Sequence, residues 1–142
     1  MNIPRIWMIA TDGSHYAELS TQYASKLFRL MPEKPDVWIV NVVSDPGGVG
    51  RDGLAREIGQ AEKMLEKISK GFSDDGSQHE NVQTLVEVGD PRKKLVEVLK
   101  RLDVEHLFMG GADFSTGSAD LTSGGITNYM LHHLKGMATI VK

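Results

Sequence analysis

Short apolar runs that alternate with amphipathic stretches are the feature that most constrains how this chain folds. The first run, IWMIA, is apolar throughout, and the second, VWIVNVV, is rich in β-branched residues. Such runs are typical of strands that are covered on both faces of a sheet. Strands are therefore expected at residues 6–10, 37–43, 82–88, 104–109 and 138–141, with Trp7 and Trp38 in the core.

The stretches between these runs have the spacing and the end signals of helices. Helices are expected over residues 14–31, 52–72, 90–102 and 125–134. Ser14 is a suitable N-cap for the first, and Asp90 followed by Pro91 supplies an N-cap and an N1 proline for the third. The second has the clearest apolar stripe, formed by Leu54, Ile58, Ala61, Leu65, Ile68 and Phe72.

This alternation predicts an α/β fold, with a parallel sheet and helices on both of its faces. The chain of 142 residues is expected to form one domain, residues 1–142, because it contains neither an internal repeat nor a linker. In open parallel sheets, ligands bind beyond the carboxyl ends of the strands, where the strand order reverses. The loops at residues 11–14 and 110–125 leave such ends, and they share one crevice if the first and fourth strands are neighbours.

The composition excludes several classes of function. The chain has no cysteine, so it has no disulfide, no thiol catalysis and no thiolate metal site. A net charge of −3 gives no indication of a nucleic-acid partner. The apolar run at the start is too short for the core of a signal peptide or for a membrane span. With 40% apolar and 25% charged residues, the sequence reads as a globular protein, and a cytoplasmic one is expected.

The loop from Gly110 to Gly125 is the most informative segment for function. It contains five glycines and five serine or threonine residues, but neither a P-loop nor a G-x-G-x-x-G motif. Its glycines would let backbone N–H groups converge on an anion, with Ser123 placed to bind that anion or to cap the last helix. The alternative is a surface loop that binds nothing, and Asp113 and Asp120 add charges that a phosphate would avoid.

Three other polar clusters give weaker indications. Residues 12–15 include an Asp, a Ser and a His, but sequence neighbours rarely form a catalytic triad, so Asp12 is interpreted as a hydrogen-bond acceptor for a ligand. His132 and His133 are adjacent on an expected helix and point about 100° apart, so they cannot chelate one metal ion. The basic run at residues 92–94 is interpreted as a solvated helix face.

Five segments taken together resemble the universal stress protein family over essentially the whole chain. They are Asp12-Gly13-Ser14, Val40-Asn41-Val42-Val43, Val88-Gly89-Asp90-Pro91, Phe108-Met109-Gly110 and Ala138-Thr139-Ile140-Val141. They are similar to the V-D-x-S, L-H-V-V, x-G-x-P, V-M-G and P-V-L-V-V segments of the family. The shared order and spacing make the resemblance more specific than any one segment.

The resemblance implies a five-stranded sheet in the order 3-2-1-4-5. It also implies a homodimer, formed by antiparallel pairing of the last strands, here from Ala138 to Val141. Such pairing would satisfy backbone groups that are otherwise left open at the edge of the sheet.

Family members that bind ATP resemble one loop pattern: Gly, two residues, Gly, nine residues, Gly, then Ser or Thr. The first glycine corresponds to Gly110, but the second falls on Asp113. The third falls on Gly124 and the hydroxyl residue on Gly125, with ten residues instead of nine between Asp113 and Gly124. Ser123 or Thr127 could replace the missing hydroxyl, whereas Asp113 adds a side chain and a negative charge where phosphate should approach.

The resemblance implies a nucleotide site at Thr11, Asp12, Val42, Met109, Gly110, Asp113, Ser123, Gly124, Gly125 and Ile126. We expect a regulatory protein that binds ATP or AMP weakly, with or without Mg²⁺, because the adenine side of this site matches the family. The alternative is a dimeric protein-interaction module that binds no nucleotide. A slow ATP hydrolase with a metal at Asp113 is a third hypothesis, although no arginine finger is visible near the loop.

Overall fold

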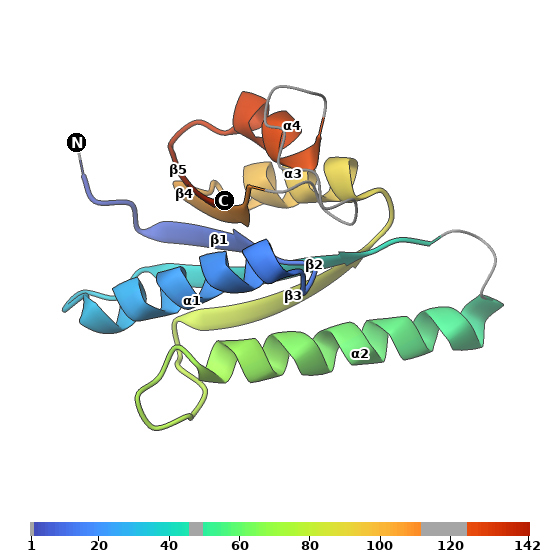
Figure 1. Ribbon diagram of the computed structural model, residues 1–142, viewed down its shortest axis with the longest axis horizontal. Coiled ribbons are helices and arrows are strands. Elements are labelled where there is room, and N and C mark those ends of the chain that lie inside the picture. The colour runs from blue at the N-terminus through green and yellow to red at the C-terminus, as the bar shows by residue number, and fades with distance from the viewer. Residues whose placement is uncertain (1, 46–49, 112–124) are drawn as a thin grey trace.

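The computed structural model describes residues 2–45, 50–111 and 125–142, and Figure 1 shows its strands and helices. The strands are β1 (Ile6–Ala10), β2 (Asp36–Val43), β3 (Val82–Val88), β4 (His106–Gly110) and β5 (Met137–Val141). The helices are α1 (His15–Leu30), α2 (Gly50–Lys70), α3 (Pro91–Arg101) and α4 (Ile126–His133). All the strand pairs are parallel, and the order β3-β2-β1-β4-β5 confirms the predicted sheet.

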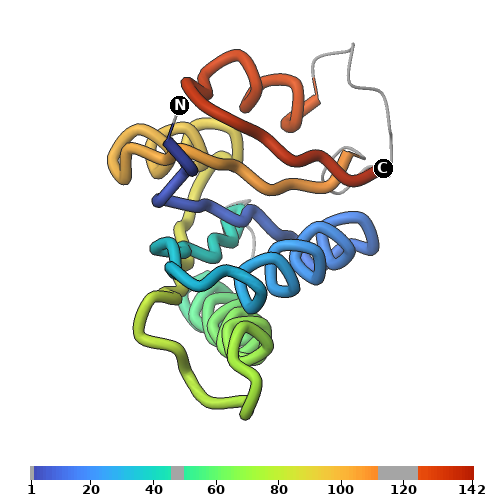
Figure 2. Tube along the Cα trace, turned by 90° about the vertical axis from the view of Figure 1, so that its left-hand side faces the viewer, coloured from blue at the N-terminus to red at the C-terminus, as the bar shows by residue number. Residues whose placement is uncertain are grey.

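The helices cover both faces of the sheet, as Figure 2 shows end-on. Successive residues of β1 point to opposite faces, so Trp7 packs with residues of α1 and α2, while Met8 packs with residues of α3 and α4. Both side chains are almost fully buried, at 2% and 0% exposure. Trp38 is only half-buried, so the expectation that both tryptophans lie in the core holds fully for Trp7 alone.

The element boundaries differ from the predicted ones by one to a few residues. Helix α2 ends at Lys70, and Phe72 is buried just beyond it rather than within the helix. Ser14 lies at the N-cap position of α1, but its hydroxyl makes no cap hydrogen bond, so the predicted side-chain cap is wrong. Asp90 does cap α3, since its side chain accepts a hydrogen bond from the Arg92 backbone N–H at 2.9 Å.

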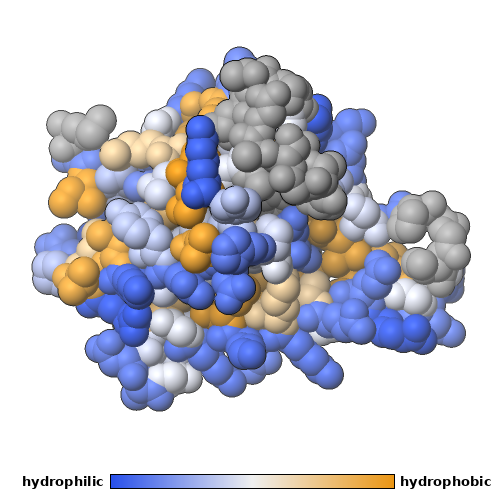
Figure 3. Space-filling view, in the orientation of Figure 1, coloured by the Kyte–Doolittle hydropathy of each residue, from blue (hydrophilic) through white to orange (hydrophobic). Residues whose placement is uncertain are grey.

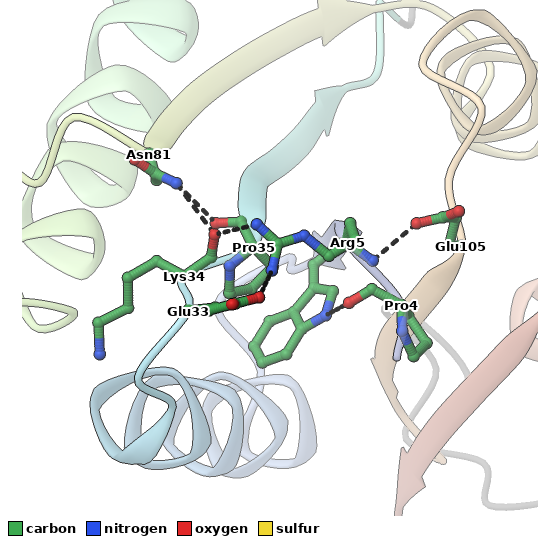
Figure 4. A network of polar contacts seen from close by, with 8 residues as sticks. Pro4, Arg5, Glu33, Lys34, Pro35, Asn81 and Glu105 are labelled. Atoms are coloured by element: carbon green, nitrogen blue, oxygen red, sulfur yellow. Dashed lines mark hydrogen bonds and ion pairs between the residues drawn. The ribbon is translucent and has the colours of Figure 1, made fainter. Parts of the chain in front are cut away.

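The amino ends of the strands are held together by polar contacts, as Figure 4 shows. The backbone N–H of Arg5 donates to Glu105 Oε1 at 2.6 Å, and its guanidinium contacts Glu33 Oε2 at 3.3 Å. On the same side, the Asn81 amide donates to the carbonyls of Lys34 and Pro35. These contacts hold the amino ends of β1 and β2 to their neighbours, and two hollows lie at the opposite, carboxyl ends of these strands.

Among the described residues, no helix is both long and apolar enough to cross a membrane.

Candidate ligand-binding site

A cavity of about 210 Å³ lies at the carboxyl ends of β1 and β2. Asp12, Asn41 and Val42 line it from the two strand ends. Pro91, at the start of α3, and Ile126, at the start of α4, line it from the helices. The sheet order reverses here, because β1 has β2 on one side and β4 on the other. The cavity therefore lies where an open parallel sheet is expected to bind a ligand.

The turn after β1 fixes the position of Asp12. The backbone N–H of Thr11 donates to the Val40 carbonyl at 3.0 Å, which extends the strand pairing by one residue. Asp12 Oδ1 accepts from the Ser14 backbone N–H at 2.9 Å, and the Thr11 hydroxyl accepts from the Gly13 N–H at 3.2 Å. Gly13 has φ of +79°, a conformation that glycine adopts without strain. The half-buried carboxylate of Asp12 is thus held at the cavity wall.

Asn41 is a site residue that the sequence analysis did not assign. Its side chain is 9% exposed, and its Nδ2 donates to the carbonyl of Thr11 at 2.7 Å. This bond ties β2 to the turn after β1 and orients the amide beside Asp12. The signal in the sequence is a single polar residue in the otherwise apolar run VWIVNVV, since a buried amide is retained only when it finds partners.

Gly110 lies at the end of β4, and a packing requirement accounts for its lack of a side chain. A Cβ atom there would lie 2.9 Å from the Ala17 nitrogen and equally close to Tyr16, at the start of α1. The Gly110 carbonyl accepts a hydrogen bond from the buried Thr127 hydroxyl at 3.0 Å. The Thr127 hydroxyl therefore uses its proton to link α4 to β4. This argues against the predicted role of Thr127 as a substitute hydrogen-bond donor to a phosphate.

The remaining predicted site residues fall into three groups. Gly125 is the buried N-cap residue of α4, directly before Ile126 at the cavity wall. Met109 is fully buried in the core cluster under α3 and α4, so it lies behind the site, within the core. Asp113, Ser123 and Gly124 lie outside the described residues, as do most of the loop to which they belong.

A second, more open hollow of about 470 Å³ lies on the α2 side of the same strand ends. It shares Asp12, Asn41 and Ser44 with the first cavity and adds Glu57 and Gln60 from α2. Among the described residues, neither hollow is lined by lysine or arginine, and no group of three or more His, Asp or Glu could hold a metal ion. The two hollows suit a ligand that donates hydrogen bonds to carboxylate and amide oxygens.

A third hollow, a groove of about 370 Å³ between α1 and α2, has an apolar floor that includes Met64 and Ile68. Figure 3 shows hydrophobic surface between the hydrophilic outer faces of these two helices. The groove meets the site at Thr11 and Gly13.

Comparison with known proteins gives a consistent result. A model described as "Universal stress protein family" matches residues 5–142. The solved structure of universal stress protein UspA from Lactobacillus plantarum has 15% identity and a TM-score of 0.81, and covers 99% of this chain and 100% of that one. No curated protein sequence gives a significant match.

Two further similar structures were solved with a ligand. A universal stress protein in complex with cAMP has 17% identity and a TM-score of 0.73, with 99% of each chain covered. The universal stress protein from Archaeoglobus fulgidus in complex with dAMP has 16% identity and a TM-score of 0.66, with 100% of each chain covered. At these identities the likeness shows the shared fold.

Proposed function

This chain belongs to the universal stress protein family, and we propose that it is a regulatory protein that binds an adenine nucleotide, ATP or AMP, at the carboxyl edge of its sheet. The observation that carries the proposal is the cavity between the ends of β1 and β2 and the first turns of α3 and α4. Relatives solved with cAMP and dAMP support an adenine nucleotide as the ligand.

The residues at the cavity suit the nucleoside part of such a ligand. Val42, Pro91 and Ile126 offer apolar surface for a base, and most ligand sites combine such surface with a few polar groups. The carboxylate of Asp12 is placed to accept hydrogen bonds from ribose hydroxyls. We propose this acceptor role for Asp12, and apolar contact with the base for Val42 and Ile126.

The charge of the site favours a ligand with few phosphates. Asp12 and Glu57 are at the two hollows, and repulsion between like charges grows with each added phosphate. Mg²⁺ bound to the phosphates of ATP would reduce this repulsion. We therefore propose that AMP binds without metal and that ATP binding requires it. We propose no catalytic role for any residue.

The test is the substitution Asp12→Asn with isothermal titration calorimetry of adenosine and AMP. Asparagine keeps an oxygen that can accept from the Ser14 N–H but loses the charge and part of the acceptor capacity. Affinity for both ligands should fall about tenfold, the loss expected of one hydrogen bond to a charged group. Asp36→Asn, at the exposed start of β2, removes the same charge from the opposite edge of the sheet and should leave both affinities unchanged. Equal affinities in all three proteins would refute the role of Asp12.

A second candidate function is a dimeric interaction module that binds no nucleotide. It is favoured by β5, which pairs only with β4 among the described strands and leaves its other edge open. Met137 at its start is 42% exposed and Ala138 is also exposed. We propose pairing with a second copy through the strand from Ala138 to Val141, which is compatible with either function.

A further inference from the structure

The larger hollow, on the α2 side of the strand ends, brings hydrogen-bond acceptors together without a cation. Asn41 lines it from β2, and Glu57 and Gln60 line it from α2. Within the described ranges, no lysine, arginine or histidine lines this hollow. An acceptor that finds no donor within the protein is available to a donor on a ligand, because buried polar groups are stable only when they are paired.

The side chain of Asn41 points into this hollow. Side chains alternate along β2, so Ile39 packs in the cluster under α1 and α2, whereas Val40 packs in the cluster under α3 and α4. Asn41 therefore lies on the α1 and α2 face, the side on which α2 lines the hollow. Its amide nitrogen is the atom that contacts the Thr11 carbonyl, because a carbonyl only accepts hydrogen bonds. The amide oxygen then faces away from that carbonyl.

This oxygen, Asn41 Oδ1, is an acceptor that no described residue pairs. Asn41 is 9% exposed, and among the described residues its side chain has the Thr11 carbonyl as its one hydrogen-bond partner. In the same part of the chain, the Ser20 hydroxyl is the one side-chain group that is both fully enclosed and unpaired. Asn41 Oδ1 is therefore not sealed in the core but open to the hollow, where a donor on a ligand can reach it.

Glu57 places a negative charge in the same hollow. Its side chain is half-buried and makes no hydrogen bond or ion pair with the residues that the structure describes. Asp12 also lines the hollow, but its Oδ1 already accepts from the Ser14 backbone N–H. A charge that is partly withdrawn from water attracts an opposite charge more strongly than a fully solvated one. Glu57 therefore favours a cationic ligand.

The rest of the lining indicates what kind of cation fits. Val43, Ala61 and Met64 give the hollow an apolar part, and its volume of about 470 Å³ exceeds what one small ion fills. No group of three or more His, Asp or Glu among the described residues could hold a metal ion. A primary ammonium has three N–H donors and no acceptor, so it matches an amide oxygen beside a carboxylate. A hydrocarbon chain attached to it would lose contact with water against the apolar part.

We propose that this hollow is a binding site for a primary alkylammonium ion, whose N–H groups donate to Asn41 Oδ1 and to the carboxylate of Glu57. Its alkyl chain lies against the apolar part of the lining. Both hydrogen bonds involve an ionised group, and such bonds are roughly twice as strong as neutral ones. The site goes beyond the nucleotide-binding function proposed above and does not depend on it, because the amine requires neither a base nor a phosphate.

The test is titration of the full chain with n-butylammonium, followed by two-dimensional ¹H–¹⁵N NMR. Binding should saturate and shift the side-chain amide signals of Asn41. Tetramethylammonium has the same atoms and the same charge but no N–H donor, so it should bind at least about tenfold more weakly. Glu57→Gln should weaken n-butylammonium binding about tenfold, since it removes the charge. Glu62→Gln is the matched control: Glu62 is exposed on α2 outside the hollow, and the affinity should stay within about twofold.

Three outcomes would overturn the proposal. Equal affinity for n-butylammonium and tetramethylammonium would show attraction by charge alone, without the hydrogen bonds. Equal losses in Glu57→Gln and Glu62→Gln would show that the amine binds elsewhere on the acidic surface. Asn41 signals that do not shift with n-butylammonium would show that the hollow is not the site. A parallel titration of the native protein with AMP separates the two proposals, because AMP binding without amine binding overturns this inference and leaves the proposed function intact.

Discussion

Two explanations can account for the absence of a side chain at Gly110. The resemblance makes it the first glycine of the ATP-binding loop pattern, at a position that faces the nucleoside, whereas the structure shows the start of α1 packed against its Cα. Gly110→Ala should lower the free energy of unfolding by about 1–3 kcal/mol, because the atoms in the way are largely backbone and cannot move aside easily. Urea denaturation measures this loss. Gly59→Ala in α2 is the control: no atom lies within 4 Å of the added methyl group, and stability should rise by about 1 kcal/mol. Equal stability of the native protein and Gly110→Ala would contradict the packing explanation.

His106 makes stability depend on pH. Its ring stacks on Phe108 with centroids 4.1 Å apart, and its Nε2 lies 2.8 Å from the Thr139 hydroxyl on β5. Burial lowers the pKa of His106 below the ordinary value of 6.5, since it disfavours the charged imidazolium. The folded protein thus binds this proton more weakly than the unfolded chain does. The contribution is fully present above pH about 6.5 and is lost as the pH falls below it.

The corresponding measurement is urea denaturation at pH 7.5 and pH 5.5. The native protein should lose more stability between these two pH values than His106→Phe, which keeps the aromatic packing but has no proton to bind. His132→Gln, on the exposed end of α4, should behave as the native protein does. The same acid-induced loss in His106→Phe as in the native protein would show that another group is responsible.

How much of the site could be predicted depends on what each residue does. Asp12, Val42 and Ile126 were predicted because their types and places at element ends match a recognisable pattern, and all three line the cavity. Asn41 and Thr127 act through single hydrogen bonds to distant backbone carbonyls, of Thr11 and Gly110. Such long-range partners become visible only when the strands are in register, so the sequence marks Asn41 as an unusual polar residue in a strand and Thr127 as a hydroxyl near the loop, but does not identify the carbonyl that each one contacts.

At the scale of elements, periodicity located each strand and helix, but the two N-caps show the limit of the approach. Ser14 and Asp90 are both residue types that favour N-caps. Asp90 caps α3, whereas the N–H of Ser14 is itself bonded to the Asp12 carboxylate and its hydroxyl does not cap α1. Residue type predicts which residue lies at the N-cap position. Whether the side chain of that residue makes the cap hydrogen bond depends on the turn that precedes the helix.

The open edge of β5 leads to a prediction about assembly. If two copies pair through this strand, Ala138→Lys should convert a dimer to a monomer, because an exposed charge on an edge strand opposes pairing with another strand. Sedimentation velocity measures the change. Leu30→Lys is a suitable control, since Leu30 is 81% exposed at the end of α1 and the variant gains the same charge. A native protein that is monomeric, or an Ala138→Lys variant that stays dimeric, would contradict pairing through β5.

At the scale of the whole molecule, the alternation of apolar runs and amphipathic stretches was sufficient to predict a parallel sheet covered on both faces. The order of its strands came from the resemblance, because alternation alone does not specify which strands are neighbours. That order, now confirmed, is what brings the end of β1 and the start of α4 to one cavity. The predicted roles of Asp113, Ser123 and Gly124 fall outside the described residues and stay predictions.

The most direct test of the central claim is calorimetric titration of the native protein with AMP and with ATP, each with and without Mg²⁺. We predict that AMP binds under both conditions, and that ATP binds only when Mg²⁺ offsets the repulsion between its phosphates and the acidic groups of the site. The absence of heat in all four titrations, confirmed by a second binding assay, would contradict nucleotide binding and favour the dimeric interaction module.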